Sequence, residues 1–295
     1  MVIGMPKSKS EKEEIEARYN HKDLPKIKNV FSYTYFCLVK IGAYLFFGTG
    51  AVFLAIFVFP FIRLFASRKD KDFGITARAY VSHTFRWFLK ILAGFGGSRL
   101  VVEDRMTYRN IHGKIIVANH PSILDFVYIM SLVPNSTCIV RGSLTKTPLA
   151  GVIKQAYITN STDFDELCAE CKKVTDQGCN VIIFPEGTRT PRHGKNNYKK
   201  GAARIALYCG CDVQPLFIGG TDKYGLGKHD PFWSYNHIER YLYDIKMLPV
   251  IPTKEYKELS EPIAAKHLTQ KMEEVINSAG QDYANNHTTK TVNNY

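Results

Sequence analysis

The order of polar and apolar residues divides the chain into four segments. Residues 1–35 are polar and charged, which indicates a flexible or loosely helical arm. Residues 36–97 contain two long apolar stretches. From residue 98 to residue 280, short β-branched runs alternate with helical patterns. Residues 281–295 are rich in Asn and Thr and are predicted to form a disordered tail.

The first apolar stretch, residues 41–62, carries no charged side chain. Its 22 residues, at ~1.5 Å each, are long enough to cross a ~30 Å hydrocarbon layer. Basic residues flank both ends, so the charge distribution does not fix an orientation. Because Gly48, Gly50 and Pro60 lie within the stretch, a re-entrant hairpin is open beside a full crossing. A buried core helix is disfavoured, since the stretch has no polar face.

The second apolar stretch, residues 77–95, carries Arg86 and Lys90 next to Trp87 and Phe88. Aromatic and basic residues mixed on one helix are typical of a membrane interface, and an amphipathic core helix gives a similar pattern. We therefore predict that residues 36–97 form a membrane-anchoring helical segment and that the protein lies at a membrane.

Residues 98–280 show the alternation of strands and helices that is typical of an α/β domain. Strands are predicted at 115–118, 138–140, 181–184 and 213–218, and helices at 123–132, 148–155, 164–176 and 201–208. A last amphipathic helix is predicted at 262–278, with Ser260 placed to cap it. The expected fold is a mixed, largely parallel sheet flanked by helices and preceded by the membrane-anchoring segment.

The formal net charge of +12 indicates an anionic partner, which is a nucleic acid, an acidic membrane surface or a phosphorylated substrate. No zinc-finger spacing, basic-zipper heptad or RNP-type aromatic motif is present, so nucleic acid is not expected as a partner.

The seven cysteines are scattered through the chain without a signal-peptide pattern. They indicate a reduced domain that faces the cytosol, at the cytoplasmic or inner membrane. Cys168 and Cys171 form a C-x-x-C pair, and Cys209 lies close to Cys211. A zinc site built from them is an alternative, but second pairs at ribbon spacing are missing, so buried thiols are favoured and no metal is expected.

One chemical motif follows the strand predicted at 115–118. His120 stands at a strand-to-helix junction, and Asp125 is five residues further on. Because His120 precedes the helix, its ring can fold back towards the carboxylate. An Asp that accepts from one ring nitrogen leaves the other nitrogen as a base. A helix-capping His beside an exposed Asp gives the same spacing.

A second motif, Phe184-Pro185-Glu186-Gly187-Thr188-Arg189, also follows a predicted strand. Gly187 allows close approach of the backbone to a ligand, and Arg189 offers a fork of donors for phosphate or carboxylate. Lys199 and Lys200 lead into the helix predicted at 201–208, whose N-terminal amides attract anions. A solvated charged loop is the alternative, but it does not explain the Pro-Glu-Gly-Thr-Arg turn.

Together the two motifs resemble the glycerolipid acyltransferases of the lysophosphatidic acid acyltransferase (PlsC-like) family. That family has a His and an Asp separated by four residues, followed downstream by a Pro-Glu-Gly-Thr-Arg block. The resemblance covers about residues 98–255. Residues similar to its middle and late blocks are Arg141, Leu144, Lys146, Pro148, Gly151, Val213, Pro215 and Leu216.

The resemblance implies transfer of a fatty acyl group from acyl-CoA or acyl carrier protein to the hydroxyl of a lysophospholipid, in phospholipid biosynthesis. It implies that His120 is the general base and Asp125 its orienting partner. The expected substrate-binding residues are Glu186, Gly187, Thr188, Arg189, Arg141, Lys146, Lys199 and Lys200. No cofactor is expected beyond the acyl donor as co-substrate, and the membrane anchor ahead of the domain is typical of the family.

The chain departs from the family at Asn160, where many members carry an Arg after a short strand. Loss of a charged contact, typically worth ~1.5–3 kcal/mol, is enough to change the preferred acceptor. O-acylation of another lipid, such as an amino-acid lipid or a polyene lipid, is therefore an alternative function. A non-catalytic membrane-lipid-binding protein and a thioester hydrolase are further alternatives.

Overall fold

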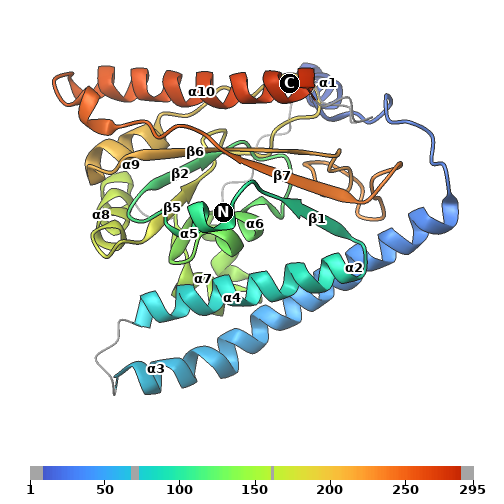
Figure 1. Cartoon of the computed structure of the whole chain (residues 1–295), viewed down its shortest axis with the longest axis horizontal. Helices are drawn as coiled ribbons and strands as arrows, with labels where there is room; N and C mark the ends of the chain where they lie inside the picture. The colour runs from blue at the N-terminus through green and yellow to red at the C-terminus, as the bar shows by residue number, and fades with distance from the viewer. Residues whose placement is uncertain (1–8, 68–72, 161–162, 287–295) are drawn as a thin grey trace.

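The computed structural model describes residues 9–67, 73–160 and 163–286, and it contains a seven-stranded sheet with helices on both faces (Figure 1). The strand order is β1-β7-β6-β2-β5-β3-β4. All neighbouring strands run parallel except β6 and β7, which are antiparallel. The predicted fold class, a mixed and largely parallel sheet flanked by helices, is confirmed.

Four of the seven strands match the predicted positions closely. They are β2 (Ile115–Ala118), β3 (Ser136–Val140), β5 (Asn180–Ile183) and β6 (Val213–Gly220). The predicted strands did not include β1 (Ser98–Val101), β4 (Ile158–Thr159) and β7 (Tyr241–Met247). β7 has the sequence Tyr-Leu-Tyr-Asp-Ile-Lys-Met, and its place in the sheet is set by antiparallel pairing with β6 rather than by its own composition.

Each face of the sheet has its own hydrophobic core, because successive side chains of a strand point in opposite directions. Ile116 and Ala118 pack against α2 (Val30–Phe53), α4 (Phe73–Gly94) and α6 (Asp125–Leu132). Ile115 and Val117 face α8, α9 and α10 on the other side. These helices span Phe164–Thr175, Gly201–Cys209 and Glu261–Asn286.

The helix at the C-terminus is longer than the predicted range 262–278. It runs through Asn286 and buries Gly280 and Tyr283, whose ring packs 5.5 Å from that of Phe217. The predicted disordered tail, 281–295, is therefore wrong for residues 281–286, and residues 287–295 lie outside the described part of the chain. The low apolar content of the last turns hid a helix that tertiary packing stabilises.

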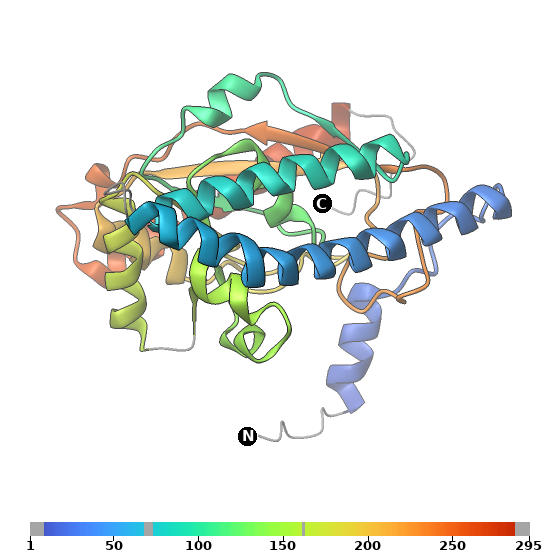
Figure 2. The same ribbon diagram turned by 90° about the horizontal axis from the view of Figure 1, so that it is seen from below.

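The N-terminal segment forms a helical hairpin along one side of the domain (Figure 2). α2 continues through a π-helical stretch, Leu54–Val58, into α3 (Phe59–Ser67), and α4 lies beside them. Residues 30–64 are long and apolar enough to cross a membrane, and only 17% of the most apolar window is buried. α2 begins at Val30, inside the range predicted as a polar arm.

The arm also contains α1 (Lys9–Tyr19), and its last residues pack on the domain. A terminal nitrogen of Arg18 donates to Lys195 O at 2.9 Å and to Asn196 Oδ1 at 2.6 Å. Of the two predicted states, a flexible or a loosely helical arm, α1 agrees with the helical one, and the flexible one is wrong for the residues that reach the domain. Residues 1–8 lie outside the described part of the chain.

The remaining short helices complete the connections. They are α5 (Arg105–Arg109), α7 (Ala150–Ala156) and the 3-10 turns Gly142–Lys146 and Thr253–Tyr256. All seven cysteines are free thiols, and Cys168 and Cys171 point from α8 into a hydrophobic core.

Candidate active site

His120 and Asp125 meet at the carboxyl end of β2. His120 Nδ1 lies 2.8 Å from Asp125 Oδ2, with the His side chain 18% exposed and the Asp side chain fully buried. The imidazole ring stacks on Phe184 at the end of β5, with ring centroids 3.9 Å apart. A buried carboxylate accepting from Nδ1 fixes the tautomer that leaves Nε2 unprotonated in the neutral ring.

The carboxylate of Asp125 is held from both sides. Its Oδ2 also accepts from the backbone N–H of Ser122 at 2.8 Å, and its Oδ1 accepts from Ser122 Oγ at 2.5 Å. Ser122 Oγ in turn lies 2.7 Å from the hydroxyl of Tyr243 on β7. Because Ser122 donates its only proton to Asp125, Tyr243 is the donor in the second bond. The hydrogen-bond chain therefore runs from Tyr243 through Ser122 and Asp125 to His120.

A buried ammonium group lies next to this chain. Lys223 Nζ donates to the carbonyls of Gly219, Thr221 and Leu242 and lies 4.6 Å from the centre of the Tyr243 ring. Burial lowers the pKa of Lys223 to about 8, and the nearby negative charge of Asp125 opposes this shift. A cation against the ring makes the phenol a better hydrogen-bond donor, which strengthens the support of Asp125.

Glu186 joins the two sequence motifs. It is buried, its Oε1 accepts from Thr190 Oγ1 at 2.5 Å and from His120 N at 3.2 Å, and its Oε2 accepts from Asn196 at 2.7 Å. Since both carboxylate oxygens are engaged inside the protein, Glu186 braces the backbone of His120. This position differs from the acceptor-binding role that the family resemblance implied for it.

The turn after β5 carries Gly187, Thr188 and Arg189. Gly187 has a φ of +66°, a conformation that favours glycine, and the Lys199 side chain crosses the turn where a Cβ would lie 2.9 Å from its Nζ. Nη1 of Arg189 donates to Leu226 O at 2.9 Å and to Gly227 O at 2.6 Å. These bonds fix the guanidinium, and within the described part of the chain its Nε and Nη2 have no hydrogen-bond partner and could bind an anion.

The other four predicted binding residues are exposed lysines and an arginine. Arg141 follows β3, two strands from β2, and Lys146 ends the next 3-10 turn. Lys199 and Lys200 precede α9. Among the described residues, none of these four side chains has a hydrogen bond or ion pair, and the structure brings only Lys199 against the Gly187 turn.

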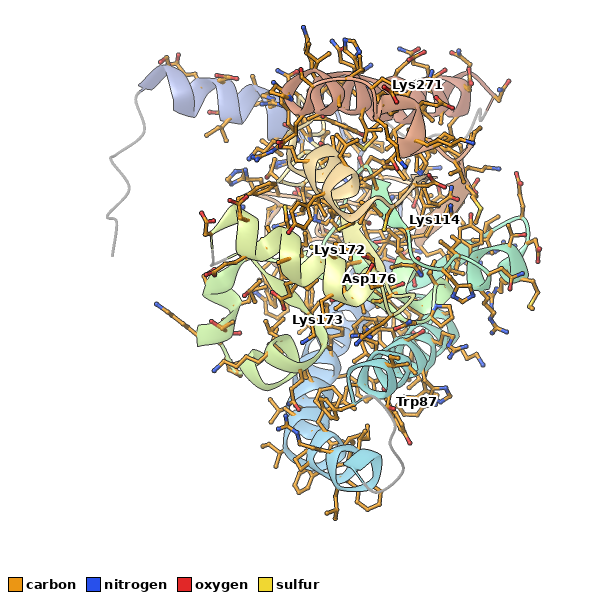
Figure 3. All side chains as sticks on the ribbon, turned by 90° about the vertical axis from the view of Figure 1, so that its left-hand side faces the viewer. Trp87, Lys114, Lys172, Lys173, Asp176 and Lys271 are labelled. Atoms are coloured by element: carbon orange, nitrogen blue, oxygen red, sulfur yellow. The ribbon has the colours of Figure 1, made fainter. Side chains whose placement is uncertain are left out.

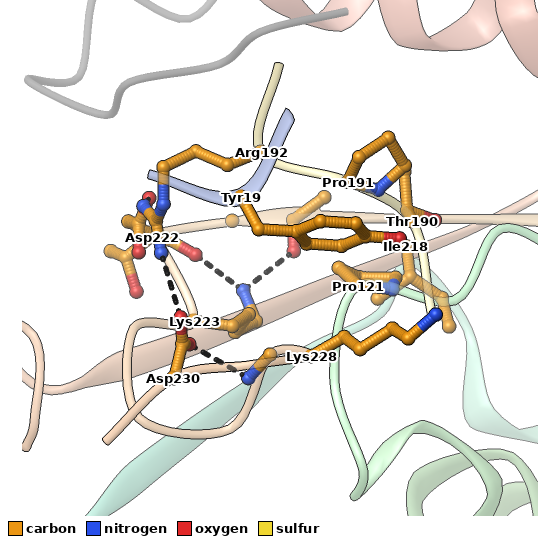
Figure 4. A pocket seen from close by; sticks show the side chains of 14 residues that line it. Tyr19, Pro121, Thr190, Pro191, Arg192, Ile218, Asp222, Lys223, Lys228 and Asp230 are labelled. Atoms are coloured by element: carbon orange, nitrogen blue, oxygen red, sulfur yellow. Dashed lines mark hydrogen bonds and ion pairs between the residues drawn. The ribbon is translucent and has the colours of Figure 1, made fainter. Parts of the chain in front are cut away.

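A pocket lies between the turn after β5 and the loop after β6, and Pro121, the residue after His120, lines it (Figure 4). Its walls include Pro121, Thr190, Lys223 and Lys228. Tyr19 from the N-terminal segment closes one side, with its hydroxyl 3.3 Å from Arg189 O and its ring 5.5 Å from Lys228 Nζ. Arg192 pairs with Asp222 at the far end.

Sequence reasoning missed Tyr19, Ser122, Lys223, Lys228 and Tyr243. Only Ser122 carried a local signal, because it lies within the His120 motif. The others are far from His120 in the sequence, and the tertiary fold brings them to the site, so no local sequence pattern could predict them.

Comparison of the sequence and fold with known proteins is consistent with this geometry. Residues 99–219, which contain both motifs, match the protein-family model described as Acyltransferase. This part of the chain is therefore a domain of the acyltransferase family. The fold is similar to the crystal structure of the 1-acyl-sn-glycerophosphate (LPA) acyltransferase PlsC from Thermotoga maritima. The TM-score is 0.60 at 25% identity, over 83% of this chain and 95% of that one.

Curated relatives carry related names. The chain is 27% identical to the chloroplastic 1-acyl-sn-glycerol-3-phosphate acyltransferase LPAT1 of Arabidopsis thaliana, over 64% of this chain and 51% of that protein. It is 25% identical to the 1-acyl-sn-glycerol-3-phosphate acyltransferase of Haemophilus influenzae, over 59% of this chain and 71% of that protein. The match thus spans about half the length of the plant relative.

We expect Glu186→Ala to lower the free energy of unfolding by about 1–3 kcal/mol, because it leaves buried donors without their acceptor. Urea denaturation measures this change. Glu103→Ala, at an exposed surface pair, is the control and should stay close to the unsubstituted chain. Equal stability of both variants would contradict the bracing role.

Glu186→Gln should show a pH-dependent effect. Burial raises the pKa of Glu186, although hydrogen bonds from Thr190, Asn196 and His120 oppose the shift. The contribution of such a carboxyl to folding is complete below its unfolded-state pKa of ~4.3 and is lost as the pH rises through the raised folded-state pKa. The stability of Glu186→Gln relative to the unsubstituted chain should therefore increase over that window.

Proposed function

We propose that this protein is an O-acyltransferase that moves a fatty acyl group from a thioester donor to the hydroxyl of a lysophospholipid, in phospholipid biosynthesis. The observation that carries the proposal is the His120–Asp125 pair, in which a buried carboxylate holds Nδ1 at 2.8 Å and the next residue, Pro121, lines a pocket. The acyltransferase-family match and the names of the relatives support the same reaction class.

The reaction follows from the tautomer. Nε2 of His120 takes the proton of the acceptor hydroxyl while that oxygen attacks the thioester carbonyl. The tetrahedral intermediate collapses, the carbon–sulfur bond breaks, and the imidazolium returns the proton to the departing sulfur. The products are an ester and a free thiol, and no covalent acyl-enzyme is needed because thiolates are good leaving groups. Acyl-CoA and acyl carrier protein both fit as donors.

The acceptor is proposed to be 1-acyl-glycerol-3-phosphate or a close analogue. Arg189 is fixed at the site with donors to spare, and Lys199 crosses the same turn. Both suit a phosphate. Arg141, Lys146 and Lys200 extend the positive charge along the carboxyl edge of the sheet and would attract an anionic donor or acceptor.

Asn160 supports a second candidate acceptor. Its Oδ1 accepts from Gly142 N at 3.1 Å, so the side chain holds the loop after β3 in place of presenting a charge. Asn in place of Arg at this position would cost a lipid without a phosphate, such as an amino-acid lipid or a polyene lipid, less binding free energy than it would cost a lysophospholipid.

The membrane is the proposed source of the acceptor. α2, α3 and α4 expose apolar side chains that include Phe31, Leu45, Phe61 and Trp87. In Figure 3, Lys271 on α10 lies near the top of the molecule and Trp87 on α4 lies in its lower part. The exposed apolar side chains of α2, α3 and α4 suit a lipid surface.

The contacts of α2 favour an anchor that lies along the membrane rather than one that crosses it. Lys40 bonds the loop after β6, and Ala55 touches Gly151 of α7. These two positions are ~22 Å apart along the helix. If α2 crossed the hydrocarbon layer, the domain that it contacts at both positions would have to enter the lipid as well. The thiols favour a domain that faces the cytosol.

His120→Ala should abolish acyl transfer and leave vesicle binding intact. The assay incubates purified protein with labelled acyl-CoA or acyl carrier protein and a panel of lysolipids, and it separates esters from free fatty acid. His112→Ala, at an exposed histidine away from the site, is the matched control and should remain active.

Three results would contradict the proposal. Transfer by the His120→Ala variant would remove the general base. Release of free fatty acid alone would indicate a hydrolase. Vesicle binding without turnover of any thioester by the unsubstituted chain would favour a lipid-binding protein.

Tyr243→Phe should lower kcat about tenfold without raising KM, because it removes the donor that orients Ser122 towards Asp125. Ser122→Ala should lower kcat further. The double variant should have nearly the kcat of Ser122→Ala, because both residues act through the same series of hydrogen bonds to His120. Tyr108→Phe is the control. The buried hydroxyl of Tyr108 donates to Ile245 O on β7, the strand that carries Tyr243, but it is not part of the series of hydrogen bonds to His120. Additive losses in the steady-state rates would contradict a connected chain.

A further inference from the structure

The loop between β6 and β7 exposes two adjacent aromatic side chains. Phe232 is 55% exposed and Trp233 is 67% exposed, so neither packs into a core. The loop itself is firmly built. Asp230 Oδ2 accepts from the backbone N–H of Gly225 at 2.8 Å and of Gly227 at 3.0 Å, which fixes a turn inside the loop. Large exposed aromatics on a well-held loop need an explanation other than disorder.

The loop is fixed to α2 by a buried lysine. Lys40 is the only charged residue of α2 and is 4% exposed. Its ammonium donates to Gly225 O at 3.2 Å, to Phe232 O at 2.8 Å and to Ser234 O. The ammonium group therefore donates all three of its protons to one loop. Separation of the Phe232 backbone from α2 would leave a buried charge without one of its hydrogen bonds, which is unfavourable.

Aromatic contacts continue from α2 onto the loop. The ring of Phe232 stacks on Tyr44, with centroids 6.0 Å apart, and the ring of Phe36 stacks on Tyr235 at 5.1 Å. α2 and the loop thus share aromatic contacts, and the ring of Trp233 lies 5.7 Å from that of Phe232. Indole is enriched where a protein meets lipid headgroups, because its body is apolar and its N–H can remain hydrated.

We propose that Phe232 and Trp233 form a second membrane contact, in which Trp233 enters the headgroup region of a lipid bilayer while Lys40 holds the loop to the anchor. The proposal rests on the proposed function, which supplies the lipid surface. The attachment of the loop to α2, whose apolar side chains are exposed, favours a bilayer over a protein partner.

The same loop bounds the active site. Leu226 O accepts from Arg189 and from the backbone N–H of Ile123, three residues after His120. Gly227 O also accepts from Arg189. A lipid surface that meets Trp233 therefore lies one loop away from the guanidinium proposed to bind the acceptor phosphate. The contact would place the entrance to the site at the level where headgroups reside.

The chain contains only two tryptophans, Trp87 and Trp233, so fluorescence can report on each separately. In the full-length Trp87→Phe variant, emission comes from Trp233 alone. Vesicles of equimolar phosphatidylcholine and phosphatidylglycerol should shift this emission to the blue. Lipids brominated near the headgroup should make it roughly twofold weaker, because quenching requires contact at interfacial depth.

The Trp233→Phe variant, which retains Trp87 on α4, is the matched reporter for the anchor. Quenching of Trp87 without quenching of Trp233 would overturn the proposal, as would no response from either residue. A blue shift of Trp233 that depends on protein concentration and occurs without vesicles would indicate a second copy on the loop, and would overturn it too.

A functional readout separates this proposal from the acyl-transfer proposal. Trp233→Ser should weaken vesicle binding severalfold while leaving turnover of a short-chain acceptor in detergent solution unchanged. Unchanged vesicle binding would overturn the membrane contact even if acyl transfer is demonstrated. Absence of acyl transfer in the unsubstituted chain would contradict the proposed function without affecting the quenching result.

Discussion

The site depends on one buried carboxylate. Asp125 is fully buried, and a charge in that position requires hydrogen bonds to both oxygens. Ser122 and His120 supply them, Tyr243 on β7 supports Ser122, and Lys223 from the loop after β6 lies against the Tyr243 ring. The carboxylate therefore has a single orientation, and the imidazole that it holds has a single tautomer. A more exposed carboxylate would rotate, and the ring would lose its defined basic nitrogen.

The sheet explains why two motifs 66 residues apart form one site. β2 and β5 are parallel neighbours, so the segments that follow them emerge at the same edge. Glu186 uses this adjacency, because it binds the backbone of His120 from the end of β5. The proposed base and the proposed phosphate ligand, Arg189, are thereby positioned by one rigid element rather than by two independent loops.

Much of the architecture was predictable from local patterns, whereas the support of the site was not. The buried strands β2, β5 and β6 read as β-branched runs, and the His120 spacing predicted the observed contact with Asp125. Tyr243 gave no signal, because its place beside Ser122 depends on the antiparallel pairing of β7 with β6. Glu186, in contrast, was predicted as a site residue, but a sequence motif does not determine whether a carboxylate faces a ligand or the interior of the protein. Residues 281–286 looked disordered because their helix is stabilised by packing rather than by composition.

The tautomer of His120 is the most direct test of the account. Nitrogen-15 NMR of histidine-labelled protein in detergent, with His120 identified by its absence from the His120→Ala spectrum, reports which ring nitrogen carries the proton in the neutral form. The account predicts a proton on Nδ1 and an unprotonated Nε2. A neutral ring protonated on Nε2 would contradict it, because that ring could neither donate to Asp125 nor accept a proton from a substrate hydroxyl.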